Sequence, residues 1–315
     1  AGHTGAYASA PLVSLHGIQW KYKTGGSIVS SPVISGNTVF FGSDDSVLYA
    51  VDAEKGTLRW KFRTGGRVSS SAAVDHGKVY FDGCLYCLEE KTGRELWKFT
   101  SAGEKVFSAP GIHGVPEKDR TLDDPWEMYL SSPVVAEGLV FFGTGSGMFY
   151  AVDTESGKMK WEFKTGDVIH ASPAYADSTV FFGSWDSYLY ALHTSDGKVR
   201  WSFKTGTDTV IYNQVGFQSS PAVTGGTVYV GCRDAHVYAI DSKTGTLKWK
   251  YYNNGSWVIA TPAVRNDTAY FTTPDTHKLI ALQASDGREL YTGSCKTYGF
   301  SSPALAGDFL YAGND

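Results

Sequence analysis

The chain has 315 residues, and its 28 Lys and Arg stand against 32 Asp and Glu, for a net charge of −4. This balance gives no reason to expect nucleic acid as a partner, and no apolar run reaches the roughly 18 residues that a membrane-spanning helix needs. Hydrophobic residues make up 42% of the chain, which excludes disorder, and 36 glycines favour many short strands joined by tight turns.

The first clear unit of the chain ends at Trp60 and reads as four strands. A Gly36-Asn37 pair has the chemistry of a hairpin turn. A second turn at Asp52–Gly56 combines a carboxylate that can accept backbone hydrogen bonds with a glycine that supplies positive φ. The predicted strands are Ile28–Ile34, Val39–Gly42, Val47–Val51 and Leu58–Phe62.

The last part of this unit recurs five more times with identical internal spacing, as Ala-x-Asp-x3-Gly-x3-Trp or a near copy. The large flat tryptophan at a fixed place in each unit is expected to pack between adjacent sheets. A second marker, Ser-Ser-Pro or a near copy, occurs seven times and ends at Pro32, Ala72, Pro133, Pro173, Pro221, Pro262 and Pro303. The final residues of the six repeats are Trp60, Trp97, Trp161, Trp201, Trp249 and Tyr291.

Four antiparallel strands per unit of about 40 residues, repeated radially, predict a β-propeller. The seven markers predict an all-β, seven-bladed β-propeller formed by residues 1–315 as one domain. The chain ends in a second-strand pattern, so we expect Ile18–Tyr22, which contains Trp20, to close the ring as the outer strand of the last blade. The third strand of that blade is supplied by Gly5–Ala10, or by chain beyond Asp315.

These spaced residues resemble the tryptophan-docking motif of pyrroloquinoline-quinone-type (PQQ-like) propeller repeats, from about Ile18 to the end of the chain. The opening Gly-His-Thr-Gly-Ala-Tyr also looks like the N-terminal lead of secreted members. The resemblance implies the fold and an extracytoplasmic location, in the periplasm or at the cell surface. Its superfamily includes quinone-dependent dehydrogenases, the propeller lipoprotein of the outer-membrane barrel-assembly machinery, and kinase sensor domains.

The dehydrogenases of that superfamily carry two adjacent cysteines over the quinone and a Glu, Asn and Asp set around calcium, and neither feature is found in this sequence. We therefore expect no cofactor, with quinone and calcium as the alternative. Cys84 and Cys87 lie on one predicted strand and point to opposite faces, so a bridge between them needs distortion. Cys232 and Cys295 pair only if neighbouring blades bring them together; buried free thiols are the expected state.

Two insertions interrupt the otherwise regular spacing between tryptophan and proline marker. That spacing is 12 residues from Trp20 to Pro32, but 36 after Trp97 and 20 after Trp201. The insertions, residues 101–129 and 207–217, both connect one blade to the next and therefore fall on one face of the predicted propeller. Loops presented by a rigid scaffold often carry function, so this face is the predicted functional face.

Candidate ligand-binding residues lie in the insertions, on the inner strands near the axis, and in the short loops of the same face. The tryptophans outside the docking series are either stacking platforms for a ring or a peptide side chain, or are buried against a neighbouring loop. The histidine is either functional or a hydrogen-bonded structural residue, and the charged residues are either binding groups or a solvated rim. The candidates are Arg67, Trp126, His170, Trp185, Asp186, Tyr212, Gln214, Gln218, Arg233, Trp257 and Tyr298.

No nucleophile elbow, phosphate loop or zinc-binding helix motif is present in the sequence, and no spaced oxygen ligands follow Asp44-Asp45, so neither catalytic residues nor a metal are assigned. The leading hypothesis is a non-catalytic, monomeric scaffold that binds a protein or glycan partner on the loop-rich face. The alternative is an enzyme with an axial site, either a quinone-dependent oxidoreductase or a carbohydrate-active hydrolase or lyase. A structural repeat domain of a larger protein is the third possibility.

Overall fold

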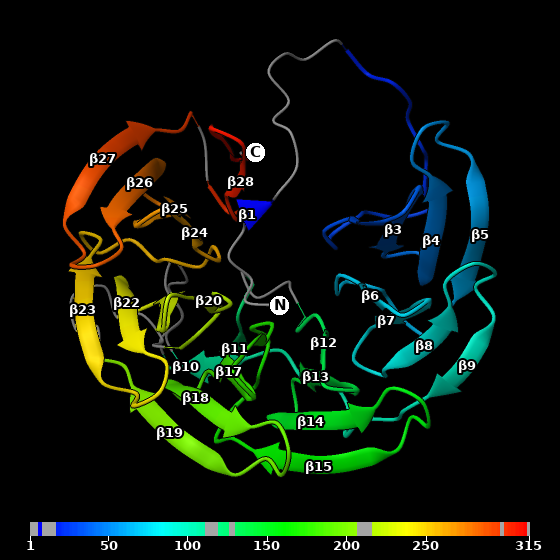
Figure 1. Cartoon of the computed structure of the whole chain (residues 1–315), viewed down its shortest axis with the longest axis horizontal. Helices are drawn as coiled ribbons and strands as arrows, with labels where there is room; N and C mark the ends of the chain where they lie inside the picture. Colours follow the sequence, from blue (N-terminus) through cyan, green and yellow to red (C-terminus); the bar gives the residue numbers. More distant parts are fainter. Residues whose placement is uncertain are drawn as a thin grey trace.

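The computed structural model describes residues 6–7, 17–110, 119–125, 130–206, 216–296 and 299–313. Throughout these ranges the regular structure consists of β-strands, and Figure 1 shows the sheets arranged around a ring that is viewed down its axis. In the same ranges there is no helix long and apolar enough to span a membrane. The all-β architecture expected from the sequence is confirmed.

Within the described ranges, six of the blades are four-stranded antiparallel sheets whose strands follow one another in chain order. The first strand of each sheet is the innermost and the fourth lies on the outer rim (Figure 1). The first three sheets are β2 (Val33–Ser35), β3 (Thr38–Ser43), β4 (Val47–Asp52) and β5 (Leu58–Arg63); β6 (Ala73–Asp75), β7 (Lys78–Phe81), β8 (Tyr86–Glu89) and β9 (Glu95–Lys98); and β12 (Val134–Ala136), β13 (Leu139–Gly143), β14 (Met148–Asp153) and β15 (Met159–Lys164).

The next three sheets repeat this pattern and, with the smaller sheet described below, complete seven blades in the described ranges. Their strands are β16 (Ala174–Ala176), β17 (Thr179–Gly183), β18 (Tyr188–His193) and β19 (Val199–Lys204); β20 (Ala222–Thr224), β21 (Thr227–Gly231), β22 (His236–Asp241) and β23 (Leu247–Tyr252); and β24 (Ala263–Arg265), β25 (Thr268–Thr273), β26 (Lys278–Gln283) and β27 (Glu289–Ser294).

Each repeat tryptophan packs on the glycine turn of the next blade. Trp161 lies against Gly197, where a Cβ would stand 2.6 Å from an indole carbon, and its Nε1–H donates to the Thr194 carbonyl at 2.8 Å. The Gly197 φ of +69° also disfavours any residue with a side chain. The same packing joins Trp20 to Gly56, Trp60 to Gly93, Trp97 to Gly157, Trp201 to Gly245, and Trp249 to Gly287.

The alanine of the repeat provides the space that the tryptophan on the neighbouring strand needs. Ala50 faces Trp60 across the β4–β5 pair, and the register shifts immediately after Ala50, so a bulge forms where the small side chain leaves room for the indole. Equivalent shifts occur after Cys87, Ala151, Ala191, Ala239 and Ala281.

The Ser-Ser-Pro marker holds neighbouring blades together at the inner end. The backbone N–H of Ser132 donates to the hydroxyl of Ser172 at 2.9 Å, and the N–H of Ser172 donates to the hydroxyl of Ser220 at 2.9 Å. The preceding serine acts within its own blade, since the Ser131 hydroxyl accepts the Gly143 N–H. Further links between blades run from Ser31 to Ser71, from Ser71 to Ser132, and from Thr261 to Ser302.

The last sheet differs from the prediction. It contains β1 (Ala6–Tyr7), β28 (Ala304–Ala306) and β29 (Phe309–Tyr311), in the order β1-β28-β29, with β1 parallel to β28. The placement of Gly5–Ala10 beside the second strand is therefore wrong for Ala6–Tyr7, the part of that stretch that the structure describes. These two residues instead pair with the first strand of the sheet.

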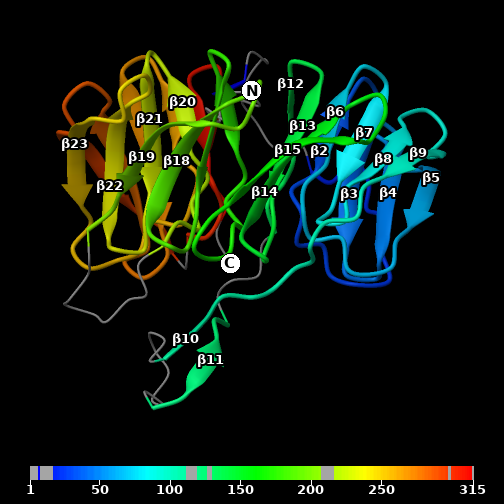
Figure 2. The same ribbon diagram turned by 90° about the horizontal axis from the view of Figure 1, so that it is seen from below.

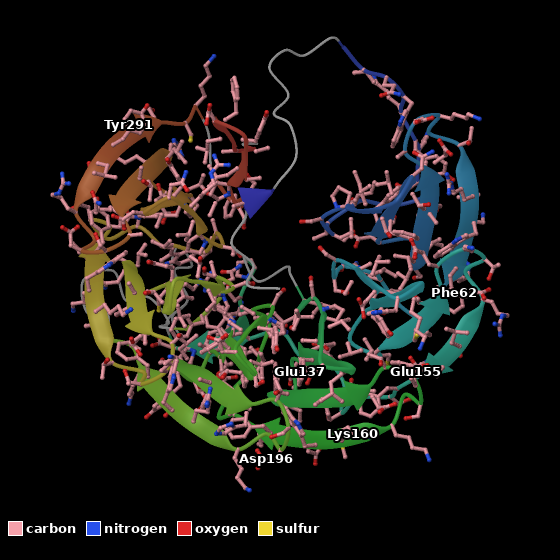
Figure 3. The ribbon with its side chains drawn as sticks, viewed as in Figure 1. Phe62, Glu137, Glu155, Lys160, Asp196 and Tyr291 are labelled. Atoms are coloured by element: carbon pink, nitrogen blue, oxygen red, sulfur yellow. The ribbon has the colours of Figure 1, made fainter. Side chains whose placement is uncertain are left out.

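The expected outer strand at Ile18–Tyr22 is also wrong, because these residues form no strand. Among the described residues no third strand lies beside β29, so this stretch has no partner with which to form a ladder. Trp20 nevertheless docks on the first blade, where its Nε1–H donates to the Ala53 carbonyl at 2.8 Å. Tyr291, which replaces the tryptophan in β27, is 59% exposed on the outer rim (Figure 3).

Aromatic side chains from adjacent sheets fill the space between blades. Phe149 of one blade stacks on Phe182 of the next, with ring centroids 3.8 Å apart, and both rings are fully buried. All four cysteines are free, as expected; Cys87 and Cys232 are also buried as expected, whereas Cys84 and Cys295 are half-buried.

We predict that Gly197→Ala lowers the free energy of unfolding by about 3 kcal/mol or more, because the new methyl group displaces Trp161 in addition to straining the turn. Gly226→Ala is the matched control, since Gly226 has φ +71° and open space around it. This control should cost about 1 kcal/mol. Urea unfolding measures both, and equal losses for the two variants would contradict the docking role.

Candidate functional site

The insertion after the second blade lies on the face that carries the loops between second and third strands. Figure 2 shows β10 (Ser108–Pro110) and β11 (Thr121–Asp123) beyond this face of the ring, as a hairpin separate from the blades. The two strands pair antiparallel and form a sheet of their own. The second insertion, residues 207–217, lies outside the described residues except for its last two positions.

The insertion begins with a contact at Glu104. The Glu104 carboxylate accepts the Gly145 N–H at 2.6 Å and lies 3.6 Å from Nε2 of the buried His170. Gly83 and Gly145 make room for this segment: a Cβ on Gly83 would stand 2.3 Å from Glu104 Oε1, and one on Gly145 would stand 2.1 Å from the Lys105 carbonyl oxygen. The start of the insertion is therefore seated directly on the loops of two blades.

The next contact is an aromatic stack. The Phe107 ring stacks on Trp185 with centroids 4.1 Å apart and an interplanar angle of 12°. Together with Ala109 and Val168, these residues form a small apolar cluster at the base of the hairpin. Trp185 lies in the β17–β18 loop and is 3% exposed, so the stack buries almost all of its indole.

The third contact is a buried ion pair. Arg233, in the β21–β22 loop, is 1% exposed, and its guanidinium pairs with the carboxylate of Asp124, which follows β11. The guanidinium carbon lies 4.6 Å from the ring centroid of Trp185 and 3.8 Å from that of Trp257. Arginine is rarely buried without a charge partner, and here it has a carboxylate in addition to two aromatic rings.

This geometry decides between the two alternatives for the tryptophans outside the docking series. Trp185 and Trp257 are both buried, at 3% exposure each. Trp185 packs on Phe107 of the insertion, and both rings contact the Arg233 guanidinium. They do not stand open as stacking platforms, and Arg233 is not part of a solvated rim. The structure brings these three predicted residues together, but as the seat of the chain's own insertion.

The other predicted residues are spread over the face. Arg67 is exposed in the link between the first two blades, and Gln218 is half-buried just before β20. His170 is buried, and its Nε2 lies 3.6 Å from the Glu104 carboxylate; whether this histidine is functional or structural stays a prediction. The remaining candidates, Trp126, Tyr212, Gln214 and Tyr298, lie outside the described residues.

Asp186 is a structural cross-link between blades. Its carboxylate accepts the Gly166 N–H and the Tyr190 hydroxyl, each at 2.8 Å. Asp45 has the same arrangement with Gly25 and Tyr49, at 2.8 and 2.7 Å. Although burial acts in the opposite direction, these hydrogen bonds lower the pKa of Asp45. The recurring Asp-x3-Tyr spacing in the sequence is the signal that could have identified this role.

Sequence reasoning missed Glu104, Phe107 and Asp124, which anchor the insertion. Asp124 and Arg233, which form the buried ion pair, are 109 positions apart in the sequence. No local sequence pattern predicts such a pair. A buried arginine between two tryptophans does, however, require a carboxylate partner from another part of the chain.

Two observations bear on a metal or a flat cofactor. In the part of the chain that the structure describes, no group of three or more His, Cys, Asp or Glu residues could hold a metal ion. The Trp185 ring, which could stack on a quinone, is covered by Phe107 and approached by the Arg233 guanidinium. The described residues at this position therefore do not fit a planar cofactor.

A family model described as outer membrane protein assembly factor BamB matches residues 15–84 and 81–315 of the chain. No curated protein matches the sequence. Among solved structures, BamB from Moraxella catarrhalis is similar with a TM-score of 0.76 and 16% identity, over 99% of this chain and 94% of that one.

Two further structures are similar in fold at comparable identity. A europium-containing methanol dehydrogenase has a TM-score of 0.71 and 14% identity, over 91% of this chain and 74% of that one. The computationally designed Ika8 protein has a TM-score of 0.56 and 15% identity, over 97% of each chain. At these identities the likeness concerns the fold alone.

The insertion's seat also contains a titrating carboxyl group. Burial raises the pKa of Asp82 to about 6; the Gly83 N–H opposes this shift, and the nearby Glu104 carboxylate adds to it. The folded state thus binds a proton more readily than the unfolded state, in which the pKa is about 3.9. The free energy of unfolding should therefore fall as pH rises from about 4 to 6.

We predict that Asp82→Asn removes this slope and raises the free energy of unfolding at pH 7 by about 1–3 kcal/mol. Urea unfolding between about pH 4.5 and 7 measures the effect. The same slope in the variant and in the unmodified protein would show that Asp82 is not the titrating group.

Proposed function

The chain belongs to the family of the outer membrane protein assembly factor BamB, and on this basis we propose that it is a non-catalytic binding scaffold that acts outside the cytoplasm. Its proposed partner is a protein that takes part in outer-membrane protein assembly. The proposed binding surface is the face that carries residues 101–110 and 119–125, with strands β10 and β11 as its most prominent element (Figure 2).

The observation that carries this proposal is a hairpin that is anchored at its base and exposed at alternate positions of its strands. Phe107 and Asp124 hold the base on the ring. Ser108, Thr121 and Asp123 are exposed. A two-stranded hairpin has little stability of its own in water, so its anchoring on a rigid scaffold supports a role in presenting these strands to a partner.

The same geometry favours a protein partner over a glycan and over an axial enzyme site. A glycan platform needs an open aromatic face, whereas Trp185 and Trp257 are buried. An axial catalytic site needs reacting groups that substrate can reach, whereas Arg233 is covered by the insertion. We propose that this role needs no cofactor; the quinone-dependent alternative stays a prediction, tested by adding quinone and calcium to the purified protein.

A photo-reactive residue placed at Thr121 tests the proposed surface in cells that make the protein. We predict that this position crosslinks to a protein of the outer-membrane assembly apparatus. The matched control is Glu155, whose side chain is 81% exposed in the turn between β14 and β15. This turn is at the opposite end of β14 from the β13–β14 loop, which contacts the insertion. Crosslinked products are identified by mass spectrometry.

Crosslinks at Thr121 that are absent at Glu155 would support the proposal. Identical products at both positions would show non-specific contact. If Thr121 yields none while the folded protein is present at its normal level, this face is not the binding surface.

A further inference from the structure

We propose that Arg233, held between Trp185 and Trp257, is a binding site for an acidic segment of a protein partner, and that Asp124 of the insertion occupies it as an internal ligand. The proposal deepens the proposed function and rests on it. It names the chemistry of the partner segment, a carboxylate with a nearby aromatic side chain, because that is what the insertion presents to the same site.

The site is built for a carboxylate. The ring centroids of Trp185 and Trp257 lie 4.6 and 3.8 Å from the guanidinium carbon. The two rings therefore restrict the orientation of the guanidinium plane, and its N–H donors point outward within that plane. The Arg233 backbone is held as well, since its N–H donates to the Gly216 carbonyl at 3.2 Å. A guanidinium with a fixed plane matches the planar fork of a carboxylate.

The scaffold does not require a buried cation at this place. The equivalent loop positions of other blades are occupied by Asp44, Gly145 and Trp185, and those blades form the same four-stranded sheets. A buried ion pair adds little stability beyond what an apolar pair of similar shape would give. Arg233 and its carboxylate are therefore better explained by recognition than by support of the blade.

Asp124 enters the site from a stretch of the insertion that is otherwise mostly exposed. Asp124 is fully buried, yet Thr121, Asp123 and Pro125 around it are exposed. Its N–H donates to the Phe107 carbonyl at 2.8 Å, so the two groups that enter the site are also linked to each other. The Phe107–Asp124 unit is thus a compact recognition element, which a partner segment with the same two groups can replace.

A peptide with the sequence of residues 104–125 tests whether this element binds as a separate ligand. The full chain carrying Phe107→Ala and Asp124→Asn loses the internal ligand. We expect it to bind the peptide at least tenfold more tightly than the unmodified chain, in which the tethered element competes at high effective concentration. Isothermal titration calorimetry measures both affinities.

Three controls assign the binding to the ion pair. A peptide with Asp124→Asn should bind at least tenfold more weakly, whereas one with Asp123→Asn should bind as the original does, because Asp123 is exposed. Adding Arg233→Met to the variant chain should abolish binding. Equal affinity for the Asp124→Asn peptide, or binding that survives Arg233→Met, would overturn the proposal.

If the variant chain does not fold, amide hydrogen exchange of the unmodified chain tests whether the peptide displaces the insertion. Excess peptide should accelerate exchange of the chain's own amides at residues 104–110 and 119–124 as it displaces the insertion. Unchanged exchange rates at saturating peptide would overturn the proposal. Crosslinking at Thr121 is independent of these results, so this inference can fail while the proposed function stands.

Discussion

The structure depends on the contact between an indole ring and the glycine turn of the following blade. In every contact the glycine comes from the turn that precedes the fourth strand of a sheet. The tryptophan comes from the fourth strand of the preceding sheet, except for Trp20, which lies before the first blade. The turn needs positive φ and the ring needs the space of an absent side chain, so one residue type satisfies both conditions. The rest of the repeat, including the alanine opposite the tryptophan, makes room for this contact.

This contact explains why the fold could be predicted from the sequence. The residues of each repeat motif lie within eleven positions of one another, and the motif occurs six times with the same spacing, so sheets, turns and blade order follow from local signals. The ends of the chain could not be predicted in the same way. Trp20 kept its docking role, but Ile18–Tyr22 did not form a strand, because a strand also needs a neighbour for its backbone hydrogen bonds.

The sequence predicted where the candidate residues lie, but it did not predict that they are buried under the insertion. Interrupted spacing identified the face, and Trp185, Arg233 and Trp257 do come together there. Trp185 and Arg233 are contacted by Phe107 and Asp124, which come from a distant part of the chain and which no periodicity in the sequence predicts. Residues that break a repeat therefore mark where to look, whereas what covers them is decided by the three-dimensional course of the insertion.

The docking contact also gives the row of blades a direction, in the way that head-to-tail interfaces do in assemblies of separate subunits. Such an interface closes into a ring or continues into a filament, depending on whether its two ends meet a partner. Here the receiving end, Gly56, is already filled by Trp20 of the same chain. The glycine turn of the first blade is therefore occupied from within the chain, as the turns of the later blades are.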